Sequence, residues 1–216
     1  MDLVKLTIMS KSILFVFILC TFSLTVNGQY LGIKGGLNLS DFNIDKDKLN
    51  DEKLRTGYHF GAFLQLPLSD GFAIQPEVLY STKGTLANYQ NDETGIGGEI
   101  NFKVDYIDVP VLGVFKLGDL AEIHLGPYFG FTSKTRIEKT GLFGDNEPEF
   151  DKDFVKSLDY GLVAGVGLNF GFMNFGARYN YGLQKIENSE VADIFIGNAT
   201  NRNFQIYGAI RIGNYD

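Results

Sequence analysis

The chain has 216 residues, of which 44% are hydrophobic, with a formal net charge of −7 at pH 7 and a single cysteine. An acidic chain without a basic stripe is a poor partner for nucleic acid, and one cysteine excludes a disulfide framework. After the N-terminal segment, no apolar run reaches the roughly 20 residues that a membrane-spanning helix needs. A location in a membrane would therefore require a closed barrel of strands.

Residues 1–28 have the composition of a secretory signal peptide. Lys5 and Lys11 precede the apolar run 13–20, and residues 26–28 offer small or tolerated side chains for cleavage before Gln29. This order of a basic, an apolar and a small-residue region is typical of such signals. We expect cleavage after residue 28, leaving residues 29–216 as one barrel domain. The cleavage removes Cys20, two lysines and one aspartate, so the net charge becomes −8.

Apolar and polar residues alternate in eight segments of the mature chain, with the two-residue period of a strand. The pattern is clearest in the predicted hairpin 158–183, where Leu162 and Val166 share an apolar face opposite Val163 and Gly165. In chain order, the predicted strands are 30–40, about 55–67, about 72–84, about 101–117, about 120–134, 158–170, 173–183 and about 201–213.

The connections between these strands alternate in length. The long ones are 41–54, 85–100, 135–154 and 185–200, and the short ones are 67–71, 118–119 and 171–172. In an up-and-down barrel, this alternation places all long loops at one end and all short turns at the other, as in bacterial outer-membrane barrels.

Aromatic residues on the apolar face gather near both ends of the predicted strands, as the two interfacial girdles of a membrane barrel do. The loop-end set is Tyr58, Tyr80, Phe131, Tyr160, Tyr181 and Phe204, and the turn-end set is Phe72, Phe115, Phe170 and Phe172. We therefore predict an all-β fold, an eight-stranded antiparallel up-and-down transmembrane β-barrel in the outer membrane of a Gram-negative cell. Both termini are expected in the periplasm.

A soluble barrel with an apolar interior shows the same alternation turned inside out. Its polar face would point outward and carry many charges. Here the polar face is rich in glycine and sparse in charge, which suits the narrow interior of an eight-stranded barrel. The pattern favours the membrane barrel over a soluble periplasmic lipid carrier.

Several segments resemble the recurring strand motifs of one bacterial family. They are residues 33–42 (IKGGLNLSDF), 75–81 (QPEVLYS), 106–110 (YIDVP), 126–128 (GPY) and 176–179 (GARY). Together they resemble the PorT-like outer-membrane β-barrel family of Bacteroidetes-type bacteria, and the resemblance spans residues 30–213. It implies an integral outer-membrane barrel, in a family whose namesake is linked to protein secretion. Outer-membrane barrels often end on an aromatic residue, whereas here Tyr215 is followed by Asp216.

Charged residues on the inward face are the first candidates for a functional site. By parity, this set is Lys34, Glu77, Asp108, Lys116, Glu122, Asp159, Arg178 and Arg211. Buried charges without partners are very costly, so we expect these side chains to pair. They form either a proton or ion path or an ion-paired plug, and the small interior of eight strands favours the plug.

Neither a metal site nor a catalytic centre has a clear signature. His59 and His124 share the inward parity with Glu122, but no third ligand follows at metal-like spacing. A hydrolase needs a nucleophile, a base and an orienting acid. Ser81, His59 and Asp105 are conceivable, although no motif selects them. We expect no metal, no cofactor and no catalytic residue.

The acidic segment 145–153 has carboxylates at alternate positions but lacks the glycine and the terminal glutamate of a calcium-binding EF-hand loop. We interpret it as a solvated loop or one that faces lipopolysaccharide, and cation binding there stays open.

The sequence thus predicts a non-enzymatic outer-membrane barrel with a structural or surface-interaction role, linked to adhesion or protein secretion. The alternatives are a barrel enzyme with a loop-end active site and a soluble lipid-binding barrel. The expected partners are outer-membrane lipid and lipopolysaccharide, with proteins at the extracellular loops, and we expect a monomer.

Overall fold

The computed structural model describes residues 29–43, 52–90, 97–140, 156–185 and 200–212. The predicted signal peptide and the acidic segment 145–153 lie outside these ranges. Among the described residues, no helix is long and apolar enough to cross a membrane.

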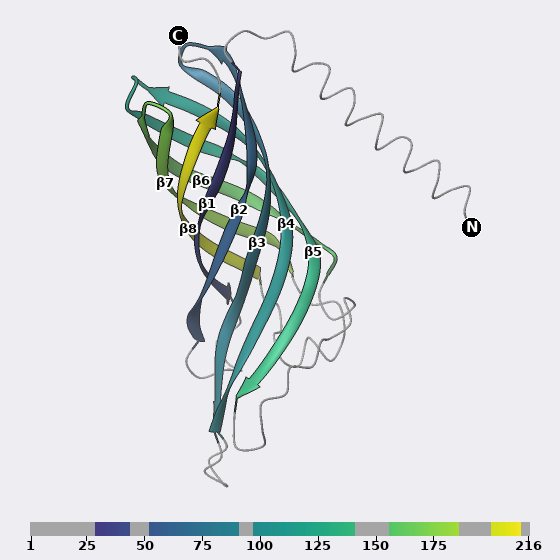
Figure 1. The fold of residues 1–216 in the computed structure, drawn as a ribbon. Coiled ribbons are helices and arrows are strands. Elements are labelled where there is room, and N and C mark those ends of the chain that lie inside the picture. Colours follow the sequence, from purple (N-terminus) through teal and green to yellow (C-terminus); the bar gives the residue numbers. More distant parts are fainter. Residues whose placement is uncertain (1–28, 44–51, 91–96, 141–155, 186–199, 213–216) are drawn as a thin grey trace, which may run out of the picture.

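Eight antiparallel strands close into one barrel in which each strand pairs with its neighbours in sequence and β1 pairs with β8 (Figure 1). The strands are β1 (Tyr30–Asn43), β2 (Glu52–Ser69), β3 (Phe72–Gln90), β4 (Gly97–Leu117), β5 (Ala121–Thr140), β6 (Leu158–Phe170), β7 (Met173–Lys185) and β8 (Thr200–Ile212). The predicted fold class is confirmed.

Three short turns join β2 to β3, β4 to β5 and β6 to β7 at one end of the barrel, where β8 also ends (Figure 1). Two of these turns contain a glycine in the left-handed region, Gly118 with φ of 69° and Gly171 with φ of 61°. Only glycine adopts this conformation without a steric cost, so both residues are suited to their tight turns. We call this the turn end and the opposite end the loop end.

Several strands continue past their predicted limits at the loop end. β3 runs to Gln90, β4 begins at Gly97 and β5 runs to Thr140, inside segments that we predicted as loops 85–100 and 135–154. The sequence loses its regular apolar alternation there, although the backbone pairing continues. β3 to β5 span 19, 21 and 20 residues against 13 in β6, and they project beyond the other strands (Figure 1).

The apolar face of the strands points outward. Leu162 and Val166 are 50% and 58% exposed, whereas Val163 between them is 1% exposed. The interior instead buries charged and amide side chains such as Glu77 and Gln205. A soluble carrier with an apolar lumen is therefore the wrong alternative, because the apolar surface lies on the outside.

Aromatic side chains cluster on this outer face near both ends. Tyr58, Phe60 and Tyr80 lie together near the loop end, with ring centroids between 5.4 and 6.3 Å apart. Phe72 and Phe115 lie 5.0 Å apart near the turn end. Such rings favour the boundary between lipid and water, so the two sets delimit the membrane-spanning part of the barrel.

Candidate functional site: the polar network inside the barrel

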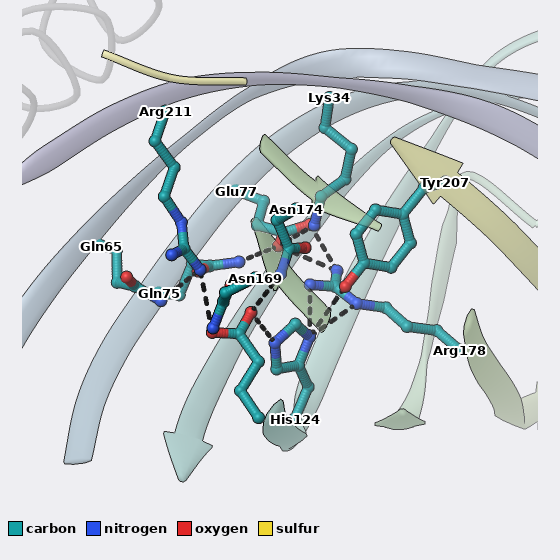
Figure 2. Close-up of polar contacts among 11 residues, drawn as sticks. Lys34, Gln65, Gln75, Glu77, His124, Asn169, Asn174, Arg178, Tyr207 and Arg211 are labelled. Carbon is teal, nitrogen blue, oxygen red and sulfur yellow. Dashed lines mark hydrogen bonds and ion pairs between the residues drawn. The ribbon is translucent and has the colours of Figure 1, made fainter. Parts of the chain in front are cut away.

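Glu77 on β3 is the centre of a buried polar network in the turn-end half of the barrel (Figure 2). Its Oε1 accepts hydrogen bonds from Lys34 Nζ on β1 at 2.7 Å and from Gln75 Nε2 at 2.6 Å. Nη1 of Arg178 on β7 lies 2.8 Å from each carboxylate oxygen of Glu77. Gln65 on β2 extends the network through a 2.9 Å bond from its Nε2 to Gln75 Oε1. One carboxylate thus connects walls of the barrel that are far apart in sequence.

Arg178 joins Glu77 to a second carboxylate through His124 on β5. Arg178 Nε donates to His124 Nδ1 at 3.0 Å, and the other ring nitrogen, Nε2, lies 2.7 Å from Glu122 Oε1. Because the two Arg178 nitrogens beside Nδ1 can only donate, Nδ1 accepts, and the hydrogen of the neutral ring then sits on Nε2 and is donated to Glu122. The Tyr207 hydroxyl lies 3.4 Å from the same Nδ1. His124 is therefore a bridge between a guanidinium and a carboxylate.

Glu122 gathers further donors at the turn end. Asn174 Nδ2 donates to Oε1 at 3.0 Å, and Arg211 donates to Oε2 at 2.9 Å through its terminal nitrogen. Asn169 Nδ2 also bonds Oε2, at 3.1 Å. Both carboxylates of this layer are therefore saturated with donors, which is what keeps an ionised carboxylate tolerable in a dry interior.

The long cationic side chains pack against one aromatic ring, and inward-facing glycines leave space for them. Tyr207 on β8 lies beneath both of them, with its ring centroid 4.3 Å from Lys34 Nζ and 4.7 Å from Arg178 Cζ. A Cβ atom at Gly165 would lie 2.5 Å from Arg178 Cγ, and one at Gly176 would lie 2.3 Å from the Tyr207 hydroxyl. The inward glycines of β6 and β7 thus supply the space that the Arg178 and Tyr207 side chains occupy.

A second ionic layer lies nearer the loop end and is centred on Lys83 of β3. Its Nζ is 2.9 Å from Asp108 Oδ1 and 3.7 Å from Asp159 Oδ2. The rings of Tyr106 and Tyr128 lie 4.6 and 4.8 Å from the same nitrogen. Tyr128 and Asn201 complete the layer by donating to Asp159 Oδ2 at 3.0 and 2.8 Å.

Asn38 on β1 forms hydrogen bonds with further polar residues beside these two layers. Its Oδ1 lies 2.8 Å from His59 Nδ1 and accepts a 3.0 Å bond from Gln205, while its Nδ2 donates to Ser81 Oγ at 3.0 Å. His59 and Ser81 are thus held by an amide.

Asp105 lies on the opposite face of the wall, because β4 buries Val104 and Tyr106 on its inner side and exposes Ile107 on its outer side. Its partner is Arg136 on β5. The conceivable trio of Ser81, His59 and Asp105 is therefore not assembled.

The predicted interior charges divide by their place along the strands. Six are at most 5% exposed and form ion pairs or hydrogen bonds, namely Lys34, Glu77, Asp108, Glu122, Asp159 and Arg178. Arg211 reaches Glu122 with a side chain that is 10% exposed. Lys116 is half-buried beside the β4–β5 turn, and the described part of the chain contains no carboxylate paired with it. It stays outside the network because the strand ends one residue later, at Leu117.

Lys83 is a buried charge that the sequence reasoning overlooked. It has the same inward parity along β3 as Glu77 and Leu79, and this parity could have identified it as a buried residue. We placed the end of the strand at residue 84, where a charge is expected to reach water. The true strand continues to Gln90, so Lys83 is fully buried.

The network spans the interior with ion pairs and hydrogen bonds. Within the described ranges, no group of three or more His, Cys, Asp or Glu side chains is placed to hold a metal ion. These hydrogen bonds and ion pairs connect the strands to one another across the interior.

Several outer-membrane barrels of known structure are similar to this chain. Ail, the attachment invasion locus protein of Yersinia pestis, solved in complex with the heparin analogue sucrose octasulfate, is 15% identical with a TM-score of 0.46, covering 85% of this chain and 99% of Ail. Neisserial surface protein A is 13% identical with a TM-score of 0.47, covering 86% and 98% of the two chains. OprG from Pseudomonas aeruginosa is 13% identical with a TM-score of 0.36, covering 87% and 97%.

No curated protein sequence matches the chain. Residues 27–188, however, match the family described as outer membrane protein beta-barrel domain. This match spans most of the chain and agrees with the closed barrel and its apolar outer face. The chain belongs to this family of outer-membrane β-barrels and is a protein of the outer membrane.

Proposed function

We propose that this protein is a closed, non-enzymatic outer-membrane barrel that acts through its outer surface and its loop end. The observation that carries the proposal is the Glu77–Arg178–His124–Glu122 chain of contacts, which joins β3 to β7 and β5 across the lumen. A barrel whose interior is occupied by paired side chains offers neither a conduit nor a substrate cavity there. Its interactions with other molecules are then made at the loop end.

The strand motifs of residues 33–42 and 106–110 support a place in the PorT-like branch of such barrels. Adhesion or a part in protein secretion is the role that this branch suggests. Residues 1–28 supply the export signal in this proposal.

Electrical recording tests the closed lumen. Mature protein is refolded into planar bilayers, and insertion is verified by its heat-modifiable gel migration. We expect no stable conductance steps at any holding voltage, since Lys34 and Arg178 are both held on Glu77. Steady single-channel steps from verified, inserted protein would overturn the proposal.

Crosslinking on intact cells tests the interacting end. The partners of the intact protein are compared with those of a variant in which residues 141–155 are replaced by a short Gly-Ser linker, leaving β5 complete to Thr140. Loss of specific partners would support a surface-interaction role. An unchanged set would remove this segment as the binding element.

A further inference from the structure

Two glycines lie side by side on the outer face where β1 closes the barrel against β8 (Figure 1). Gly35 and Gly208 are paired in register, and the same row of the sheet continues to Phe60 on β2 and to Phe175 on β7. The outward neighbours of the glycines along the two strands are all large and exposed, namely Ile33, Leu37, Ile206 and Ile210. The outer surface is therefore hollowed at the two glycines.

This depression, which we call the seam hollow, has a volume of about 490 Å³, within the range of small-molecule sites. Lys34 borders it, but the ammonium group of Lys34 lies inside the barrel on Glu77. The apolar residues that line the hollow are Ile33, Met173, Phe175 and Ile210, together with the two glycines and Ala209. The hollow thus presents hydrocarbon and backbone, without a charged group.

Neither the backbone nor the neighbouring side chains require glycine at these two positions. Both residues lack a left-handed φ, and an added Cβ would lie 3.7 Å from its nearest neighbour at Gly35 and 3.4 Å at Gly208. The inward Gly36 differs, because a Cβ there would lie 2.0 Å from a backbone oxygen. The outward Gly113 differs as well, because the ring of Phe72 covers it at 3.2 Å. The seam hollow is therefore open space that the adjacent side chains leave unfilled.

The seam hollow belongs to the surface that contacts lipid. Phe175 packs against Phe170 of the turn-end aromatic set, with ring centroids 6.2 Å apart, so the hollow opens just inside that set. Within hydrocarbon, packing is decided by dispersion contacts, and an unfilled hollow loses them. A flexible hydrocarbon chain can fill a depression of this shape. A second barrel has a convex wall, which would meet this convex surface only along a narrow line.

The geometry points to the seam hollow as a binding site for one acyl chain of a phospholipid, in the leaflet at the turn end. The chain lies over Gly35 and Gly208 and contacts β1, β8 and β7, so it covers the junction at which the barrel closes. Recognition is of the hydrocarbon and not of the headgroup, because the lining offers no charge. The inference rests on the location in the outer membrane and is independent of whether the lumen conducts.

Photo-crosslinking of the mature protein in nanodiscs tests the site. A small share of the phospholipid carries a diazirine on one acyl chain, placed in turn near its start, middle and end, and adducts are located by peptide mass spectrometry. Ile33 beside the hollow and Leu125 on β5 are each 54% exposed on the outer face. Bulk lipid should label the two residues equally. A chain held in the hollow should label Ile33 about threefold more strongly or above, because it keeps its contacts there.

Matched variants separate a bound chain from simple shielding. Gly35→Leu with Gly208→Leu fills the hollow and should lower the yield at Ile33 to that at Leu125. Ala164→Leu adds a side chain directly opposite Leu125 in register, and it measures how far shielding alone lowers a yield. Heat-modifiable migration verifies folding, and Gly35→Leu alone repeats the test if the double variant does not fold.

Three outcomes would overturn the inference. They are equal yields at Ile33 and Leu125 in the wild-type protein, an excess at Ile33 that survives in the filled variant, and a fall in that variant no larger than the shielding effect. Labelled phosphatidylethanolamine and phosphatidylglycerol should give the same excess, and dependence on one headgroup would contradict recognition of the chain. Native mass spectrometry that shows a dimer of the wild-type protein, lost in the filled variant, would assign the hollow to a second copy.

Discussion

At the scale of single residues, the interior is organised by how many donors each carboxylate receives. Glu77 takes two cations, Lys34 and Arg178, together with the amide of Gln75. Removing such a carboxylate leaves two buried positive charges without compensation, whereas removing an exposed carboxylate changes little. The position of an acid in the barrel therefore determines how costly its loss is.

Replacement of Glu77 by Gln tests this dependence. We expect it to lower the free energy of unfolding by about 3–5 kcal/mol, because the Lys34 and Arg178 charges stay buried while their shared partner becomes neutral. Urea titration of the refolded protein in lipid vesicles measures the loss. Asp70→Asn, at an exposed position in the β2–β3 turn, is the matched control and should be neutral. A Glu77 variant as stable as that control would show that the buried pairs contribute nothing.

Gly165 and Gly35 have opposite steric surroundings and give a second test at the scale of single residues. A side chain at Gly165 would meet Arg178 Cγ at 2.5 Å and the Ala177 carbonyl oxygen at 2.6 Å, whereas one at Gly35 would meet nothing nearer than 3.7 Å. We expect Gly165→Val to destabilise the barrel by roughly 1–3 kcal/mol, as overpacking does, and Gly35→Val to be tolerated. The same urea titration decides. Equal midpoints for the two variants would contradict the packing described for Arg178.

Sequence parity identified which residues face the lumen, but it could not identify their partners. Glu77 and Arg178 lie 101 residues apart, and their contact depends on the tilt and stagger of strands around the closed barrel. Alternation along one strand carries no information on that stagger. The β-bulge at Ser133, which shifts the register of β5 against β4, was not predicted either, because Lys134 and Arg136 continue a polar run in the sequence.

At the scale of the strand, alternation was reliable where the outer face is apolar and exposed, and it failed toward the loop ends of β3, β4 and β5. The hairpin of β6 and β7 was predicted to within two residues because Leu162, Val166 and Leu168 contrast with their small neighbours. The ends of β3, β4 and β5 were predicted too short because a segment without regular apolar alternation resembles a loop. Strand length beyond the membrane is set by pairing, which has no apolar signature.

A charge on the outer face of β6 tests the orientation of this hairpin. Val166 is 58% exposed near the middle of the strand. Val166→Arg should cost roughly 2–4 kcal/mol if the position is near the bilayer centre, and Leu68→Arg near the turn end should cost about 0–1 kcal/mol. Refolding titrations of both variants measure the difference. A neutral Val166 variant would place that face in water.

At the scale of the whole molecule, closure is what makes the strands compatible with lipid. β8 completes the barrel by pairing with both β1 and β7. Without it, each of these strands would present a row of unpaired backbone groups to hydrocarbon, which lipid cannot satisfy. We expect that a chain with only the first seven strands does not insert into the membrane.

Removal of residues 200–216 tests this dependence on closure. We expect the truncated chain to lose heat-modifiable migration and to be extracted from membranes by carbonate, whereas the intact chain resists extraction. Deleting only residues 213–216, beyond β8, is the control and should leave both properties intact. A truncated chain that still migrates as a compact species would mean that closure is dispensable.

The long sequence separations inside the barrel also govern how the protein folds. Gln205 reaches Asn38 across 167 residues, and Arg211 reaches Glu122 across 89. Contacts this distant form late, because the loop-closure entropy must be overcome before they contribute, and they predict slow folding. Until β8 arrives, Glu122 and Asp159 lack the donors that Arg211 and Asn201 supply, so we expect these carboxylates to slow insertion of the unfinished barrel. Assembly of the polar interior therefore favours, kinetically, the insertion of chains whose strands are all paired in register.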